Sequence, residues 1–231
     1  MKKFSVISVD MFQTLVNVNS RRNCFWERLL PSGFPKRLAD EYWDQATALI
    51  FGNYDKLFSR DGEFINSRTI MELSFRQLFR QAGLDLQPEE AAQILTEEHG
   101  LSAPYGDTKD FLQQVGKHYP ICVVSDADDD MIRPLAGLYR FDKIFTSEQY
   151  QSYKGSPDGR FFQAVIDHYG CAPEKILHIG DSKHDVLGAE RAGLENCWLN
   201  RKGRKWNHEV QPTFTVSSLR EIASLLLEEI G

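Results

Sequence analysis

The chain has 231 residues, of which 42% are hydrophobic, and it carries a formal net charge of -6 at pH 7. This size allows a sizeable core in one large domain or in one domain with an insertion. The negative charge argues against a nucleic-acid-binding protein, and no apolar run approaches the ~20 residues of a membrane span. The apolar run after Met1-Lys2-Lys3 is too short for a signal peptide and meets an Asp. We therefore expect a cytoplasmic protein that contacts neither nucleic acid nor membrane.

Short apolar runs with the length of β-strands recur along the chain. They are Phe4–Val9, Ile121–Val124, Lys143–Thr146, Lys175–Ile179, Asn196–Leu199 and Thr213–Val216. Helix-like stretches separate most of them, and two of these stretches are followed by Gly170 and Gly193, which are typical of left-handed helix ends. Strands that alternate with helices indicate a parallel sheet covered on both faces. We predict an α/β protein with a Rossmann-like parallel sheet.

Residues 17–102 interrupt this alternation and show only helical patterns. One helical face is predicted near residues 38–50, a second helix ends at Gly83, and a third runs from Pro88 to Gly100. The simplest interpretation is a helical cap inserted after the first strand, with a core domain of residues 1–16 and 103–231 and a cap of residues 17–102. The cap is rich in aromatic residues, which are expected either to pack within it or to line a substrate pocket facing the sheet.

Polar side chains follow three of the predicted strands at the point where each strand ends. They are Asp10, Ser125 and Asp181. In open parallel sheets, ligands bind beyond the carboxyl ends of the strands, so these three side chains are expected to lie close together.

The segments around these residues are similar to four motifs of the haloacid dehalogenase superfamily. Val9-Asp10-Met11-Phe12-Gln13-Thr14-Leu15 resembles the first motif, and Val124-Ser125-Asp126-Ala127 resembles the second. Lys154 fits the third, and Ile179-Gly180-Asp181-Ser182-Lys183-His184-Asp185 fits the fourth. The resemblance covers residues 1–16 and about 103–200, and it implies the same core fold with a helical cap.

The resemblance implies a hydrolase in which Asp10 attacks the substrate and forms a covalent intermediate. Thr14 and Ser125 would hydrogen-bond the substrate or the nucleophile, and Lys154 would neutralise charge. Gln13 and Asp126 are further candidates for contact with the substrate.

The resemblance also implies a Mg2+ site made of hard oxygen ligands. Asp181 would bind the cation together with Asp10 and the backbone carbonyl of Phe12. Asp185 would complete this site by orienting the water shell of the metal or Lys154.

Phe12 departs from the pattern of the superfamily's phosphatases, which carry an acid/base Asp at this place. A positioned acid/base typically contributes ~100 to 10,000-fold to the rate. The enzyme could hydrolyse phosphates with good leaving groups, recruit an acid from the cap, release halide from a 2-haloacid, or cleave a phosphonate. The Gly180-Asp181 pair favours phosphoryl chemistry, because dehalogenases of the superfamily work without metal and generally lack this Gly-Asp arrangement, whereas this sequence keeps it.

The sequence therefore predicts a Mg2+-dependent hydrolase that acts on a small phosphorylated metabolite. A 2-haloacid dehalogenase or a phosphonate hydrolase is the alternative with the same fold, acting on a halogenated or phosphonate substrate. A binding protein that has lost turnover with the missing acid is the alternative of another class. The sequence predicts no oligomeric state.

Overall fold

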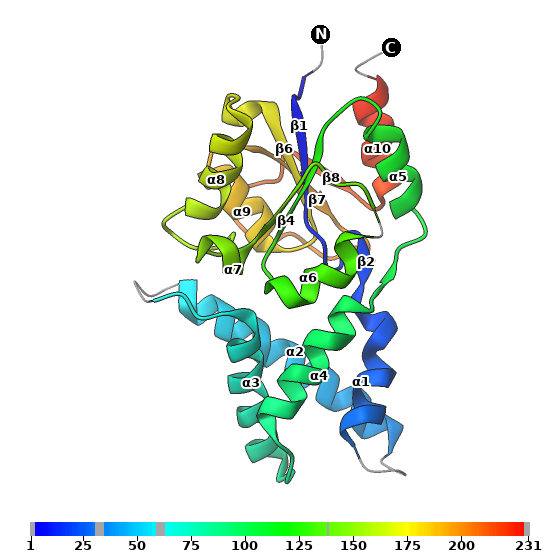
Figure 1. Cartoon of the computed structure of the whole chain (residues 1–231), viewed down its shortest axis with the longest axis vertical. Helices are drawn as coiled ribbons and strands as arrows, with labels where there is room; N and C mark the ends of the chain where they lie inside the picture. Colours follow the sequence, from blue (N-terminus) through cyan, green and yellow to red (C-terminus); the bar gives the residue numbers. More distant parts are fainter. Residues whose placement is uncertain (1–2, 31–34, 59–62, 138, 229–231) are drawn as a thin grey trace.

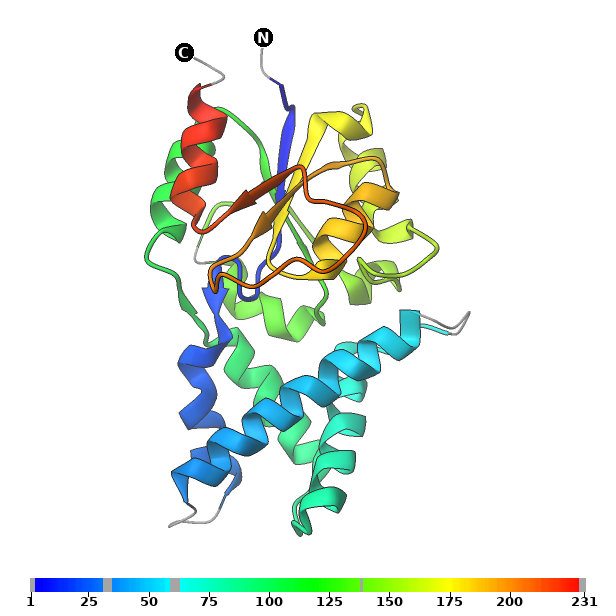
Figure 2. The same cartoon turned by 180° about the vertical axis from the view of Figure 1, so that it is seen from behind.

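The protein is described by a computed structural model over residues 3–30, 35–58, 63–137 and 139–228. A parallel sheet with the strand order β5-β4-β1-β6-β7-β8 forms its centre (Figures 1 and 2). The strands are β1 (Val6–Val9), β4 (Ile121–Ser125), β5 (Lys143–Thr146), β6 (Ile176–Gly180), β7 (Glu195–Leu199) and β8 (Phe214–Val216). The predicted parallel α/β sheet is confirmed, and its strands match the six apolar runs.

The register of the central strands brings their carboxyl ends to one level. Val9 of β1 is paired with Val123 of β4 on one side and with Ile179 of β6 on the other. The chain segments that leave these strands therefore emerge side by side at one edge of the sheet.

Alternate side chains of the strands enter two separate apolar layers, because successive residues of a strand point to opposite faces. Ile7 and Val9 face one layer, and Val6 and Val124 face the other. Helices α5 (Thr108–Val115) and α10 (Leu219–Glu228) cover the first face, and α8 (Arg160–Tyr169) and α9 (Lys183–Arg191) cover the second (Figures 1 and 2). The short helices α6 (Asp129–Ala136), α7 (Ser147–Tyr150) and η2 (Pro173–Lys175) complete the core.

Gly170 and Gly193 follow α8 and α9 with φ angles of 59° and 79°. Both values lie in the left-handed region that favours glycine, as predicted.

The helical insertion forms a cap below the carboxyl edge of the sheet (Figure 1). It consists of η1 (Val18–Arg21), α1 (Arg22–Leu29), α2 (Lys36–Phe58), α3 (Ser67–Ala82) and α4 (Pro88–Gly100). The chain enters and leaves it through β2 (Val16–Asn17) and β3 (Ala103–Pro104), which pair antiparallel. The expected cap is therefore present, whereas the division into domains at residues 17 and 102 stays a prediction.

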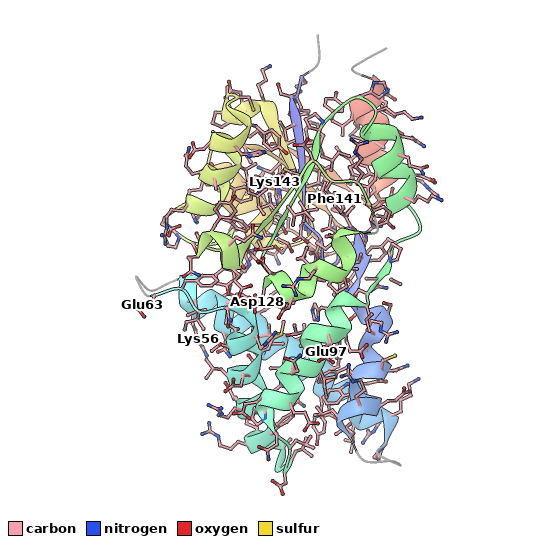
Figure 3. The ribbon with its side chains drawn as sticks, viewed as in Figure 1. Lys56, Glu63, Glu97, Asp128, Phe141 and Lys143 are labelled. Carbon is pink, nitrogen blue, oxygen red and sulfur yellow. The ribbon has the colours of Figure 1, made fainter. Side chains whose placement is uncertain are left out.

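Polar contacts hold the cap against the core. Asp128, labelled at their boundary in Figure 3, accepts hydrogen bonds from the first backbone amides of α3, those of Ser67 and Arg68, each at 2.8 Å. Asp55 of α2 accepts from Lys183 Nζ at 2.8 Å, and its other oxygen lies 3.0 Å from His184 Nε2. The second contact joins the cap directly to the first turn of α9, next to Asp181 and Asp185.

Within the described residues, no helix combines the length and the apolar character that crossing a membrane would require.

Gly188 is required by the close approach of α9 to the loop that carries Lys154. A Cβ atom at this glycine would lie 2.1 Å from the carbonyl oxygen of Lys154, whereas one at Gly52 in α2 would meet nothing within 4 Å. We expect Gly188→Ala to lower the free energy of unfolding by about 3 kcal/mol, because backbone must move. Gly52→Ala should raise it by about 0.5–1 kcal/mol, because alanine favours a helix. Urea unfolding measures both, and equal effects of the two substitutions would contradict the packing described for α9.

Candidate active site

Asp10 begins the segment that leaves β1, and its carboxylate is nearly covered, with an exposed fraction of 5%. Its Oδ1 accepts hydrogen bonds from Lys154 Nζ at 2.7 Å and from Ser125 Oγ at 3.4 Å. Burial raises the pKa of Asp10 to about 6, although the positive charge of Lys154 acts in the opposite direction. The carboxylate is therefore ionised at neutral pH and oriented by a cation.

Lys154 is 3% exposed and joins two carboxylates, because its ammonium group also contacts Asp185 Oδ1. Its backbone amide donates to Asp126 Oδ1 at 2.8 Å, which anchors the loop. Burial alone would lower the pKa of Lys154, but Asp10, Asp185 and Asp126 together raise it above the usual value. Lys154 thus remains charged despite its burial.

The two carboxylate oxygens of Asp185, at the start of α9, make different contacts. Its Oδ2 accepts from the backbone amide and the hydroxyl of Ser182 at 2.9 and 2.6 Å, in a capping box that begins the helix. Its Oδ1 contacts Lys154 and lies 2.9 Å from His178 Nε2. Burial would raise the pKa of Asp185, but Lys154 and then His178 hold it well below the usual range. Both oxygens are therefore engaged with protein groups.

Gly180 makes this position of Asp185 possible. A Cβ atom at Gly180 would lie 2.1 Å from the Asp185 carboxyl carbon. The glycine before Asp181 thus leaves room for the second acid of the same motif.

Asp181 follows β6 and lies in the same acidic region. Burial, and then the charges of Asp185 and Asp10, raise its pKa to about 7. Arg204 contacts it from the loop after β7, with a distance of 3.3 Å between the guanidinium group and Asp181 Oδ2. The loop that follows β7 therefore contributes a cation to the site.

The other predicted residues surround Asp10 in different ways. Burial raises the pKa of Asp126 to about 7. Gln13 has a φ of 63°, and its side-chain oxygen accepts from Tyr105 at 2.7 Å. The hydroxyl of Thr14 is buried and makes no hydrogen bond of ordinary geometry with a described residue, yet it lies near enough to lower the pKa of Asp10. The ring of Phe12 packs edge-on against His99 of the cap, with centroids 5.0 Å apart.

A cavity of about 590 Å³ lies between the cap and the carboxyl edge of the sheet. The predicted site residues that line it are Asp10, Phe12, Gln13, Ser125, Asp126, Lys154, Asp181 and Asp185. Thr14 is buried outside the lining. Among the described residues, no group of three or more His, Cys, Asp or Glu side chains is arranged as a metal site.

His178 is a buried partner of Asp185 that the sequence analysis did not identify. It is buried in β6, where its Nε2 faces Asp185 and its Nδ1 lies 2.8 Å from Ser8 Oγ. Burial lowers the pKa of His178, so the neutral ring accepts from Ser8 and donates to Asp185. Nothing in the local sequence indicates this contact, because strand pairing and the turn after β6 create it.

The fold and this cluster define a capped α/β protein with a buried carboxylate–ammonium–carboxylate arrangement at the end of its sheet. A family model described as haloacid dehalogenase-like hydrolase matches residues 4–193, and the chain belongs to this family of hydrolases. The superfamily assigned from the motifs is thus confirmed.

Relatives of this chain include dehalogenases and phosphatases. The chain is 26% identical to an (S)-2-haloacid dehalogenase of Pseudomonas sp. (strain YL), over 97% of this chain and 95% of the relative. It is 28% identical to a phosphoserine phosphatase of Thermus thermophilus, over 65% and 63% of the two chains. The structure of L-2-haloacid dehalogenase from Xanthobacter autotrophicus has the same fold, with a TM-score of 0.82, 17% identity and coverage of 97% of this chain and 98% of the other.

The bond between His178 and Asp185 can be tested by substitution. His178→Leu should lower the free energy of unfolding by about 1–3 kcal/mol, because it leaves a buried carboxylate oxygen with one partner fewer. His178→Gln keeps a side-chain donor and should recover part of this loss. Chemical denaturation measures both variants, and a His178→Leu protein as stable as the original would show that the bond contributes nothing.

Proposed function

We propose that this hydrolase is a Mg2+-dependent phosphatase in which Asp10 attacks the phosphorus atom of a small phosphorylated metabolite. The observation that carries this proposal is the position of Asp181 beside Asp10 and Asp185, with a pKa raised to about 7. Lys154 and Arg204 offset part of this negative charge, but the pKa of Asp181 stays raised, which favours a further cation at this place. The retained Asp181 therefore favours phosphoryl chemistry, in which a cation also balances the charge of the substrate.

The donor groups at this edge of the sheet fit Mg2+. The ion would be held by Asp10, Asp181 and the backbone carbonyl of Phe12, with water as the remaining ligand, since Mg2+ prefers oxygen donors and retains several waters. Asp185 would act from outside the ligand set, because Lys154, His178 and Ser182 occupy its oxygens. Bound Mg2+ would polarise the phosphoryl oxygens and offset their repulsion by the carboxylates.

The protein groups around Asp10 have separate proposed roles. Asp10 Oδ forms a bond to phosphorus as the bond from phosphorus to the ester oxygen breaks, and the ester oxygen leaves with the electron pair and takes a proton from water. Lys154 holds the carboxylate in place and neutralises charge that develops on the transferred group. The hydroxyl of Ser125 already donates to Asp10, and that of Thr14 makes no hydrogen bond of ordinary geometry with a described residue. Both would donate to oxygens of the nucleophile or the substrate. Asp126 and Gln13 line the cavity and would contact the substrate. Water then attacks the aspartyl phosphate, which releases phosphate and restores Asp10.

Dehalogenation of a 2-haloacid is the second candidate function. It is favoured by the full-length similarity to an (S)-2-haloacid dehalogenase and by Phe12, since a departing halide needs no proton. The substrate would then be a halogenated acid, and the nucleophile would still be Asp10. For either candidate we propose a cytoplasmic protein whose partner is a small molecule and which contacts neither nucleic acid nor membrane.

Paired assays separate these functions. We expect Mg2+ to support phosphate release from an aryl phosphate, chelator to abolish it, and Asp10→Asn to lower kcat by at least about 1,000-fold without loss of folding. Halide release from a 2-haloacid that chelator does not affect would instead support the dehalogenase. Retention of a ligand without either reaction would support the binding protein.

Cation binding should depend on pH because a proton and Mg2+ compete for Asp181. Its pKa is raised to about 7 in the metal-free protein, so the carboxyl is protonated below that pH and must release the proton when the cation binds. We expect the apparent dissociation constant for Mg2+ to rise up to about tenfold per pH unit below 7 and to level off above it. Calorimetric titrations between about pH 5.5 and 8.5 would measure this dissociation constant. Asp181→Asn is the control that removes Mg2+ binding. An affinity for Mg2+ that stays constant over this range would argue against the proposed metal site.

A further inference from the structure

The cavity has two chemically different ends. The end at the sheet carries the polar groups of Asp10, Ser125 and Lys154, whereas most of the cap wall is apolar. The apolar side chains of that wall come from η1, α2, α3 and α4; they are Val18, Trp43, Ala46, Ile50, Phe51, Tyr54, Met71, Phe75 and Leu95. A ligand that fills the cavity would place its reacting group among the polar residues and its remaining part against the apolar ones.

Part of the apolar wall is held in place by the cap core. Met71, Phe75 and Leu95 are at least 96% buried there, and Phe75 stacks on Phe25 with ring centroids 5.4 Å apart. This part of the wall therefore exists before a ligand binds.

Phe51 also lines the cavity, but unlike the buried residues of the wall it is 52% exposed to solvent. A single exposed apolar side chain is ordinary on a protein surface, but Phe51 lines the cavity, so a ligand that fills the cavity would cover it. Phe51 would gain burial if the ligand were apolar.

Several polar groups of the cap wall are already bonded within the protein. Asn19 Oδ1 accepts from Trp43 Nε1 at 3.2 Å, and Thr47 Oγ1 donates to the Trp43 carbonyl at 2.8 Å. Arg22 is paired with Asp40, although its Nε is buried without a hydrogen-bond partner among the described residues. A ligand with many hydroxyl groups would find the bonded groups occupied and would lose hydrogen bonds to water there.

The leaving group faces a second constraint, which comes from Phe12. Phe12 lines the cavity at the position where, by the resemblance described above, phosphatases carry the acid that protonates the departing oxygen. Without that acid, cleavage is fastest for an oxygen that leaves without prior protonation. A phenol, with a pKa near that of tyrosine at about 10, leaves as an aryl oxide much more readily than an alcohol does.

We propose that the substrate is an aryl phosphate, the monoester of a phenol, whose ring lies between Phe51 and the buried apolar wall of the cap. This inference rests on the proposed function and specifies its substrate class. Asp10 Oδ forms a bond to phosphorus as the bond from phosphorus to the aryl oxygen breaks. The aryl oxide leaves with the electron pair and takes a proton from water. A second water molecule then hydrolyses the aspartyl phosphate to phosphate and Asp10.

The test uses three phosphate esters with Mg2+: 1-naphthyl phosphate, naphthylmethyl phosphate and glycerol phosphate. Naphthylmethyl phosphate should keep a KM similar to that of 1-naphthyl phosphate but show a kcat at least about 100-fold lower, because its leaving group needs an acid. Glycerol phosphate should show a much higher KM, because it leaves the apolar wall empty. Equal kcat/KM for 1-naphthyl and glycerol phosphates would overturn the proposal.

A matched pair of cap variants separates ring recognition from the intrinsic reactivity of aryl esters. Phe51→Ser removes the exposed side chain at the cavity, and Leu73→Ser removes one that is 43% exposed elsewhere in the cap. Phe51→Ser should lower kcat/KM for 1-naphthyl phosphate about tenfold and leave that for glycerol phosphate unchanged, whereas Leu73→Ser should change neither. An equal effect of Phe51→Ser on both esters would overturn the proposal.

Binding measured without turnover distinguishes this inference from the proposed function. Calorimetry on the folded Asp10→Asn protein with Mg2+ should show tighter binding of 1-naphthyl phosphate than of glycerol phosphate. Selective binding together with an inactive original protein would refute the phosphatase but support the aryl site. Phosphatase activity without selective binding would support the phosphatase but refute the aryl site.

Discussion

The ammonium group of Lys154 lies between the carboxylates of Asp10 and Asp185, in a region with little access to water. A buried charge is unfavourable unless it is paired and hydrogen-bonded, so these three groups constrain one another. They come from the end of β1, the loop after α7 and the first turn of α9. The contact consequently holds three parts of the chain in the arrangement that brings Asp10 to the cavity.

Asp185 links this contact to the core of the sheet. The Asp185 oxygen that contacts Lys154 also contacts His178, which in turn contacts Ser8 of β1. Gly180 has no side chain, and this leaves space for the carboxyl group of Asp185. The position of Lys154 therefore depends in part on Ser8 and His178, which are fully buried and do not line the cavity. In the proposed reaction, these neighbours would act by orienting Lys154 and, through it, Asp10.

The cavity combines two surfaces that have different origins in the chain. The core supplies carboxylates, a hydroxyl and an ammonium group near the ends of parallel strands, and the cap supplies apolar walls whose buried side chains belong to a hydrophobic cluster shared with the core. Contacts of Asp128 with α3 and of Asp55 with α9 hold the two surfaces together. This division suits an enzyme whose chemistry belongs to the core and whose substrate selection belongs to the cap.

The sequence by itself determined the parallel sheet, the helical insertion and the family, because strand-length apolar runs, helical periodicity and ordered motifs are local patterns. It also indicated that Asp10, Ser125 and Asp181 lie at one edge, since parallel strands share the direction of their carboxyl ends. Only the tertiary structure decided that His178 supports Asp185, that Arg204 reaches Asp181 and that Phe51 stands exposed at the cavity. These contacts join residues through strand pairing, loop paths and cap placement, and the spacing of residues along the chain carries no signal for them.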